Sequence, residues 1–146
     1  MSYIKGIERI ALAVSDLEAA QTFFESWFGA RFQTEEIIED MGIRYKPFVV
    51  GESRMELLEP TRPDSPVAKF LLARGGPGVH HITFEVEDLD AALIELEARG
   101  GRITSRHDYA DGVTFEGQVW REAFVHPRDA FGVLIHIAEK RPAKPE

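Results

Sequence analysis

The sequence of 146 residues contains no cysteine, so neither disulfide bonds nor thiolate metal ligands can contribute to its structure. It has no apolar run as long as a membrane-spanning helix and no signal pattern at its N-terminus. Positive charge is also scarce, because 17 Lys and Arg stand against 25 Asp and Glu, for a net charge of −8. We therefore expect a soluble, cytoplasmic protein that has neither nucleic acid nor a membrane as a partner.

The chain does contain enough apolar material for one folded domain. Hydrophobic residues make up 44% of the sequence, which is sufficient for a core without disulfides or a structural metal. We expect a single domain over residues 1–140. Residues 140–146 are charged and rich in proline, and they predict a frayed tail.

The most informative feature is an internal repeat. An apolar segment at 7–14 followed by Asp16 returns at 79–86 followed by Asp88, an offset of 72 residues. Each apolar segment predicts a strand, and the segment after each aspartate predicts a helix. A duplicated strand-helix unit in a small chain indicates two similar modules related by a pseudo-twofold axis.

Each repeat continues with segments that are typical of strands. The expected fold class is therefore α+β, with two tandem βαβββ modules, over about 5–75 and 78–139, that form a curled mixed sheet around one cleft. The first helix is expected to begin at Ser15, with Glu18 completing a capping box. The second module is longer by eight residues, which are assigned to the loop 107–118.

Four polar residues occupy matching positions of the two modules. Arg9 matches His81, and Glu56 matches His136 on the last strand of each module. One carboxylate and two imidazoles suit a divalent metal such as Zn, Co, Ni, Mn or Fe, so Glu56, His81 and His136 are the expected metal ligands. Arginine stays protonated and cannot ligate a metal, so Arg9 is expected to form a salt bridge or to bind a substrate carboxylate.

Several stretches spread over nearly the whole chain resemble one known superfamily. They are residues 10–17, 55–60, 64–71, 79–82, 124–127 and 132–135. There the chain resembles the vicinal oxygen chelate superfamily, which includes glyoxalase I, extradiol dioxygenases and bleomycin-resistance proteins, and within it the methylmalonyl-CoA epimerase family. The segment 64–71, Asp-Ser-Pro-Val-Ala-Lys-Phe-Leu, is fairly specific to the epimerase family.

The resemblance implies four metal-ligand positions, two in each module, and this chain departs from the pattern at two of them. Glu56 stands where the family has Glu or Gln, and His81 stands where the family has His. Arg9 stands in place of a His, and His136 stands in place of a Glu that can move a proton.

The activity that the resemblance implies is that of a metal-assisted isomerase or lyase, which transfers a proton next to a carbonyl through a metal-stabilised enolate. The substrate would be a small molecule such as an acyl-CoA thioester, and the protein would be a homodimer. The resemblance places an acidic catalytic residue at Asp40 or Glu39, on one face of the substrate. If it does not bind the metal, His136 would serve on the other face, and Arg9 would bind the substrate carboxylate.

Two other functions are compatible with the same residues. One is a metal-free small-molecule binding protein of the bleomycin-resistance type, in which Arg9 and Glu56 neutralise each other. The other is an Fe(II) ring-cleaving dioxygenase, because such enzymes use two histidines and one carboxylate.

Overall fold

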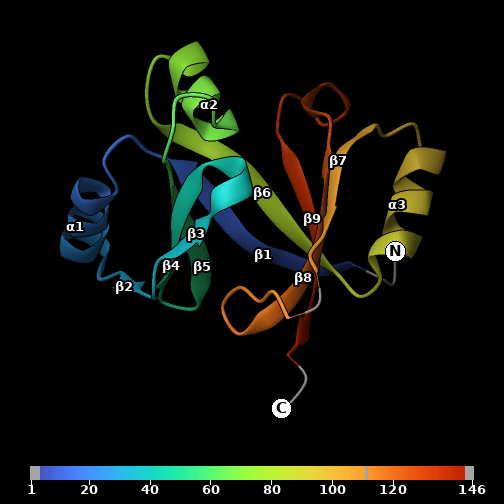
Figure 1. Ribbon diagram of the computed structural model, residues 1–146, viewed down its shortest axis with the longest axis horizontal. Coiled ribbons are helices and arrows are strands. Elements are labelled where there is room, and N and C mark those ends of the chain that lie inside the picture. The colour runs from blue at the N-terminus through green and yellow to red at the C-terminus, as the bar shows by residue number, and fades with distance from the viewer. Residues whose placement is uncertain (1–3, 111, 144–146) are drawn as a thin grey trace. The chain divides into compact units, whose positions relative to one another are not determined.

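The structure is a computed structural model that describes residues 4–110 and 112–143. The chain divides into two compact units. The N-terminal unit contains residues 9–80, and the C-terminal unit contains the described residues of 4–8 and 81–143. Each unit combines helix with strands in both parallel and antiparallel pairs, which confirms the expected α+β class (Figure 1).

The N-terminal unit is built around a hairpin. Strands β4 and β5 are antiparallel, β1 runs parallel to β5, and β2 and β3 pair with β4. The sequence did not predict β2 and β3, because strands of two and three residues are too short to show a period. The elements are β1 (Ile4–Ala13, in this unit from residue 9), α1 (Leu17–Phe28), β2 (Arg31–Phe32), β3 (Glu36–Ile38), the 3-10 helix η1 (Glu39–Met41), β4 (Ile43–Val50), β5 (Ser53–Pro60) and α2 (Pro66–Arg74).

The C-terminal unit repeats this plan. Strand β6 runs parallel to β9, and β8 is antiparallel to both β9 and β7. The elements are the first residues of β1, then β6 (Gly78–Val86, in this unit from residue 81), α3 (Leu89–Ala98), β7 (Ile103–Asp108), β8 (Gln118–Val125), the 3-10 helix η2 (Pro127–Asp129) and β9 (Ile135–Pro142).

The end of the chain differs from the prediction of a frayed tail from residue 140. Strand β9 continues to Pro142, which pairs with Gln118 of β8, so backbone pairing orders residues 140–142. Residues 144–146 of the predicted tail lie outside the described residues. The loop between β7 and β8 is residues 109–117, slightly shorter than expected, and residue 111 within it is also outside the described residues.

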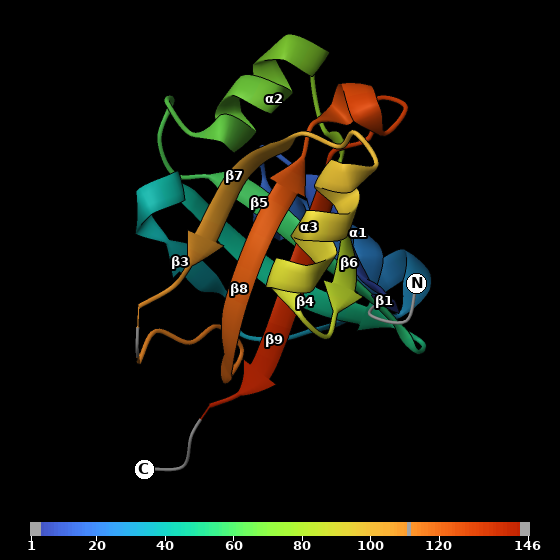
Figure 2. The same cartoon turned by 90° about the vertical axis from the view of Figure 1, so that its right-hand side faces the viewer.

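One long helix covers one face of the sheet in each unit. Helix α1 packs its Leu17 against Phe48 and Leu57 of the hairpin. In the C-terminal unit, α3 packs its Leu93 against Ile137 of β9, and Figure 2 shows the helix lying against these strands. These apolar contacts supply the core of each unit.

Both long helices begin at the repeated aspartates. Asp16 accepts a hydrogen bond from the backbone N–H of Ala19, and Asp88 does the same for Ala91, at 3.0 and 3.1 Å. The expected start at Ser15 is therefore wrong: Asp16 caps the helix through Ala19, and the N–H of Leu17, which a capping Ser15 could bind, donates to Glu59.

The register of the parallel strands supports the equivalence of the modules. Ala11 of β1 lies opposite Glu56 of β5, and Thr83 of β6 lies opposite His136 of β9. The first members of these two pairs differ by 72 residues and the second members by 80, as the repeat requires. Glu56 and His136 therefore occupy the same place in their respective units.

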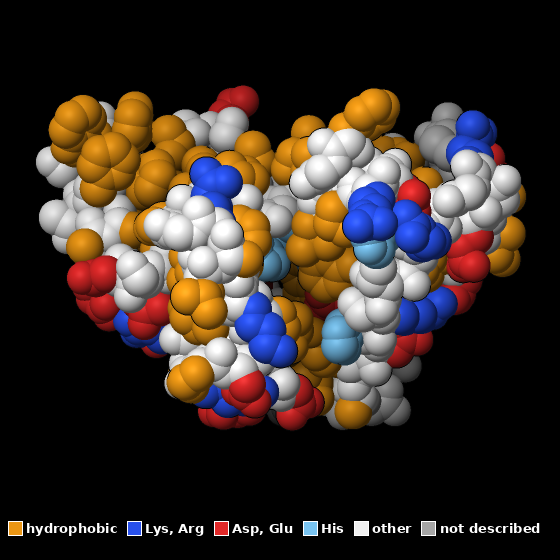
Figure 3. Space-filling view, turned by 90° about the horizontal axis from the view of Figure 1, so that it is seen from above, with side chains coloured by type: hydrophobic (Ala, Val, Ile, Leu, Met, Phe, Trp, Pro, Cys, Tyr) orange, Lys and Arg blue, Asp and Glu red, His pale blue; other side chains and the backbone are white. Residues whose placement is uncertain are grey.

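Several large hydrophobic side chains are exposed on the molecular surface (Figure 3). Three of them, Phe23, Trp27 and Phe28, lie on α1, with 5.0 Å between the ring centroids of Phe23 and Trp27. Within the described part of the chain, no helix is long and apolar enough to cross a membrane.

Candidate functional site

In each unit, the polar residues of the repeat lie on the sheet face opposite the long helix. In the C-terminal unit, Ala123 and Ile137 face α3 as part of the core. Because neighbouring side chains of a strand point to opposite faces, Glu122 and His136 point away from α3. The same alternation directs Glu56 away from α1, since the adjacent Leu57 packs on that helix.

Arg9 and Glu56 form a buried ion pair within the N-terminal unit. Arg9 Nη1 donates to Glu56 Oε2 at 3.0 Å, and the two side chains are only 3% and 10% exposed. This contact is the first of the two roles expected for Arg9. Removal of one partner from such a pair leaves an uncompensated buried charge, which typically costs about 3–5 kcal/mol.

The matching positions of the C-terminal unit hold a hydrogen-bonded set centred on His136. Its Nε2 lies 2.6 Å from Glu122 Oε2, and its Nδ1 lies 2.8 Å from Thr83 Oγ1. The rings of His81 and His136 are 5.0 Å apart at 72°, and Phe124 stacks on His136 at 4.7 Å. All five residues are buried.

The electrostatics of Glu122 determine the direction of these hydrogen bonds. Burial raises the pKa of Glu122, but the charge that His136 carries when it is protonated, its hydrogen bond, and the contributions of Tyr109 and His107 together lower the pKa from its ordinary value. An ionised carboxylate only accepts hydrogen bonds, so His136 donates its Nε2–H to Glu122. When the imidazole of His136 is neutral, Nδ1 is the acceptor and Thr83 donates its hydroxyl proton; when the imidazole is protonated, Nδ1 donates to Thr83.

The two acidic residues expected as catalytic groups, Glu39 and Asp40, both lie on η1 and are exposed. Their backbone is held by Arg62, whose guanidinium donates to the carbonyl oxygens of Glu39 and Asp40 at 2.5 and 2.9 Å. Arg62 also pairs with Asp64 at 2.7 Å. These contacts fix the turn through its backbone and not through the two carboxylates.

The residues expected to bind a metal do not fit that role. Among residues 4–110 and 112–143, no group of three or more His, Cys, Asp or Glu could hold a metal ion. The local contacts explain why. Glu56 accepts a hydrogen bond from Arg9, and both ring nitrogens of His136 have hydrogen-bond partners, so a metal ion at these residues would have to displace those partners.

A second set of contacts joins the last strand of each unit to its helix. In the N-terminal unit, Glu59 accepts from the backbone N–H of Leu17 at 2.6 Å and from Arg44 Nε at 2.9 Å. Arg44 also donates to Glu18 at 2.8 Å. One carboxylate thus caps α1 while one guanidinium joins the strand to the first turn of the helix.

The C-terminal unit contains the same contacts at matching positions. Glu139 accepts from the backbone N–H of Leu89 at 3.1 Å and pairs with Arg121 at 3.5 Å. Arg121 also donates to Asp90, at 2.8 Å. Arg44 lies opposite Glu59 across its strand pair just as Arg121 lies opposite Glu139. We conclude that this arrangement positions both helices on their sheets.

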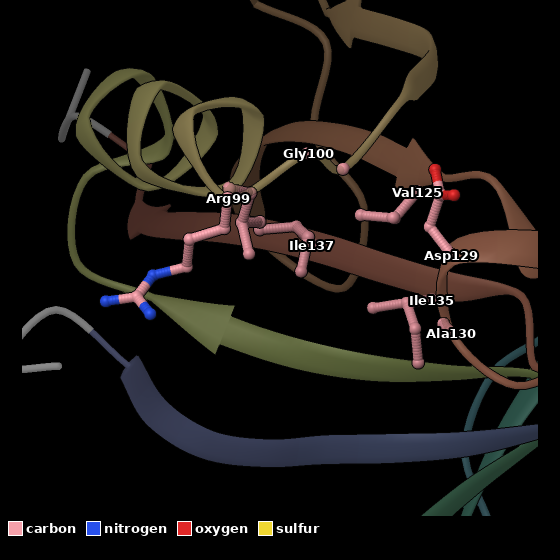
Figure 4. A pocket seen from close by; sticks show the side chains of 9 residues that line it. Arg99, Gly100, Val125, Asp129, Ala130, Ile135 and Ile137 are labelled. Atoms are coloured by element: carbon pink, nitrogen blue, oxygen red, sulfur yellow. The ribbon is translucent and has the colours of Figure 1, made fainter.

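A pocket of about 370 Å³ opens in the C-terminal unit between the end of α3 and β9 (Figure 4). Its only acidic lining residue, Asp129, is paired with Arg102 at 3.0 Å. Ile137 lines the pocket and points toward α3, so the pocket and His136 lie on opposite faces of the sheet. The lining residues are Leu96, Arg99, Gly100, Gly101, Val125, Asp129, Ala130, Ile135 and Ile137.

Sequence reasoning missed two members of the buried set, Thr83 and Glu122. Thr83 could have been found, because it is two residues after His81 and therefore shares its face. Glu122 was harder to find, because its contact with His136 depends on the register of β8 against β9.

A comparison against protein families identifies the superfamily of the chain. The profile of the Glyoxalase/Bleomycin resistance protein/Dioxygenase superfamily matches residues 6–137. The chain belongs to this superfamily, which confirms the resemblance inferred from the sequence.

The most similar relatives include methylmalonyl-CoA epimerases. The human mitochondrial methylmalonyl-CoA epimerase is 32% identical over 133 residues, which cover 91% of this chain and 73% of that protein. The crystal structure of the Mycobacterium tuberculosis methylmalonyl-CoA epimerase aligns with a TM-score of 0.81 at 32% identity, over 97% of this chain and 91% of that chain. A variant of the Streptomyces coelicolor epimerase in complex with 2-nitronate-propionyl-CoA aligns with a TM-score of 0.78 at 33% identity, over 93% and 97%.

Proposed function

We propose that this protein is an isomerase. It would invert the configuration at the carbon that lies between the carboxylate and the thioester carbonyl of a 2-carboxyacyl-CoA. The observation that carries the proposal is the presence of two buried polar pairs, one per unit, at positions that the repeat makes equivalent. The similarity to epimerases supports the substrate class, since one of these relatives was crystallised with an acyl-CoA analogue.

The reaction requires the removal of a proton from the substrate carbon and its return to the opposite face, with no net change in composition. The electron pair of the C–H bond enters an enolate, and nearby positive charge stabilises that enolate. Arg9 remains charged at all working pH values and would bind the substrate carboxylate. Asp40 or Glu39 would exchange the proton on one face, and His136 would do so on the other face.

The metal-assisted form of this reaction has no support in the residues present. An ion would have to displace the contacts of Glu56 with Arg9 and of His136 with Glu122. The proposal therefore assigns charge stabilisation to Arg9 and includes no step through a metal. The same contacts leave an Fe(II) dioxygenase without its ligand set.

The test is the conversion of enantiomerically pure methylmalonyl-CoA by the untagged full chain, followed by circular dichroism. We expect racemisation that survives dialysis against EDTA, and a loss of at least about 100-fold in kcat/KM in the Arg9→Met variant. Glu52→Gln, at an exposed turn, serves as the matched control. No racemisation by the unaltered, folded protein at any enzyme concentration would contradict the proposal.

One observation favours a second candidate function. The ion pair between Arg9 and Glu56 is the mutual neutralisation expected of a metal-free binding protein. Calorimetric binding of the same thioester without any turnover would support that function in place of the isomerase.

Two further predictions from the sequence also remain proposals. We propose that the protein is a homodimer, which light scattering during gel filtration would test. We also propose a cytoplasmic location, which cell fractionation would test.

A further inference from the structure

We infer that Glu122, His136 and Thr83 form a proton relay on one face of the substrate, with Glu122 as the positioning residue and the Thr83 hydroxyl as the group next to the reacting carbon. The inference rests on the proposed isomerase function and adds two residues to it. It is carried by the two hydrogen bonds of His136, at 2.6 Å to Glu122 and 2.8 Å to Thr83, and by the burial of all three residues.

Glu122 determines which nitrogen of His136 is basic. Its carboxylate accepts the Nε2–H, so the lone pair of the imidazole lies on Nδ1, which faces the Thr83 hydroxyl. A side chain that accepts a hydrogen bond from one ring nitrogen of a histidine, here Nε2, fixes both the tautomer and the orientation of the ring. The ring is further held by Phe124, which stacks on it at 4.7 Å.

The position of Nδ1 determines the path of the proton. Because Nδ1 faces Thr83, a proton from the substrate reaches His136 through that hydroxyl. The substrate C–H bond breaks and a new Oγ1–H bond forms, while the original hydroxyl proton moves to Nδ1. The electron pair of the C–H bond remains on the enolate, and the resulting imidazolium is stabilised by the carboxylate of Glu122. Reversal of the same steps returns a proton to carbon.

The groups around His136 favour this relay. On β6, His81 lies with its ring centroid 5.0 Å from that of His136, and Thr83 lies opposite His136 in the strand register. On β7, His107 lies opposite Glu122 and contributes to the lowered pKa of that carboxyl. Thr83 is only 1% exposed, so bulk water competes little for the hydrogen bonds of its hydroxyl.

The relay predicts an effect on one substrate enantiomer alone. In D2O, a base that removes and returns a proton on its own face exchanges the substrate hydrogen without inversion. We therefore expect Glu122→Gln and Thr83→Val to slow hydrogen exchange of one enantiomer of methylmalonyl-CoA at least about tenfold, while exchange of the other stays within about twofold. Thr83→Ser keeps the hydroxyl and should restore most of the rate. Glu85→Gln is the matched control, because Glu85 lies on β6 with Thr83 but pairs with Lys5 of β1.

A nitrogen NMR spectrum of the histidine rings distinguishes a loss of His136 positioning in the Glu122→Gln variant from a loss of the folded structure. In the unaltered protein, His136 should show a hydrogen on Nε2, and the Glu122→Gln variant should lose that tautomer preference while its far-ultraviolet circular dichroism is unchanged. Equal slowing of both enantiomers, or no slowing by either Glu122→Gln or Thr83→Val, would overturn the relay. If the unaltered protein exchanges neither enantiomer, the proposed function itself fails, and the spectrum still reports the tautomer.

Discussion

The two units share their helix-to-sheet contacts but differ in their buried polar pairs. Glu59 caps α1 and Glu139 caps α3 through the same backbone position, and an arginine binds each of these glutamates. On the opposite sheet face, one unit holds an ion pair between Arg9 and Glu56, and the other holds the His136 set. The contacts that position a helix are therefore the same in both units, while the face opposite the helix carries different chemistry in each.

The largest effect is expected from breaking the ion pair of the N-terminal unit. Arg9→Met should lower the free energy of unfolding by about 3–5 kcal/mol, because Glu56 is left buried without its partner. The double variant Arg9→Met/Glu56→Leu should recover most of that loss, because no charge then remains buried. Urea unfolding of Arg9→Met, Glu56→Leu and the double variant gives the coupling energy between Arg9 and Glu56.

A matching substitution in the C-terminal unit distinguishes the two units. His81→Phe, at the position that matches Arg9, should cost about 1 kcal/mol, because it removes no formal charge from a buried pair. Equal losses for Arg9→Met and His81→Phe, or no recovery in the double variant, would show that the Arg9–Glu56 pair and the His81–His136 pair do not differ as proposed.

A smaller effect is expected from the contacts that the units share. Glu59→Gln and Glu139→Gln should each lower the free energy of unfolding by about 1–2 kcal/mol, because each weakens a helix cap and a charged hydrogen bond. Exposed Glu52→Gln should change it by less than about 0.5 kcal/mol. Urea unfolding measures all three, and a loss confined to one of the two caps would break the equivalence of the units.

The smallest effects concern the exposed acidic residues in the first turn of each helix. The hydrogen bond from Arg44 lowers the pKa of Glu18, and the hydrogen bond from Arg121 lowers that of Asp90. A carboxyl whose pKa is lower in the folded state stabilises the protein above its unfolded pKa, and this contribution is lost as pH falls through the folded pKa.

Both carboxyls should therefore titrate in NMR spectra below their ordinary values of 4.5 and 3.8. Glu18→Gln and Asp90→Asn should each destabilise the protein slightly at neutral pH and not at all once both carboxyls are protonated in acid. If the pKa of only one of the two carboxyls lay at or above its ordinary value, the hydrogen bond from arginine to the first turn of the helix would be limited to the other unit.

The repeat made most of the fold predictable from the sequence. The α+β class followed from the repeated strands and helices, and the caps at Asp16 and Asp88 were visible as repeated residues even though the first was assigned to Ser15. The short strands β2 and β3 and the continuation of β9 to Pro142 could not be predicted, because both depend on pairing with a distant strand.

The candidate site was predictable only in part. Arg9, Glu56, His81 and His136 could be identified because the repeat aligns them. Their interactions could not be deduced in the same way, because residue types that suit a metal also suit ion pairs and hydrogen bonds. Glu122 forms a hydrogen bond with one nitrogen of His136, and only the antiparallel register of β8 and β9 brings the two residues together.

The most direct test of the central claim is a titration of the unaltered protein with Co²⁺, observed through the NMR signals of the histidine rings. The proposed arrangement at Arg9, Glu56, His81 and His136 is an ion pair in one unit and a hydrogen-bonded set in the other, not a metal centre. It predicts that the signals of His81 and His136 stay sharp and that His136 keeps its Nε2 hydrogen after addition of about one equivalent of Co²⁺. Simultaneous broadening of both rings at that ratio, with loss of the Nε2 hydrogen, would contradict it.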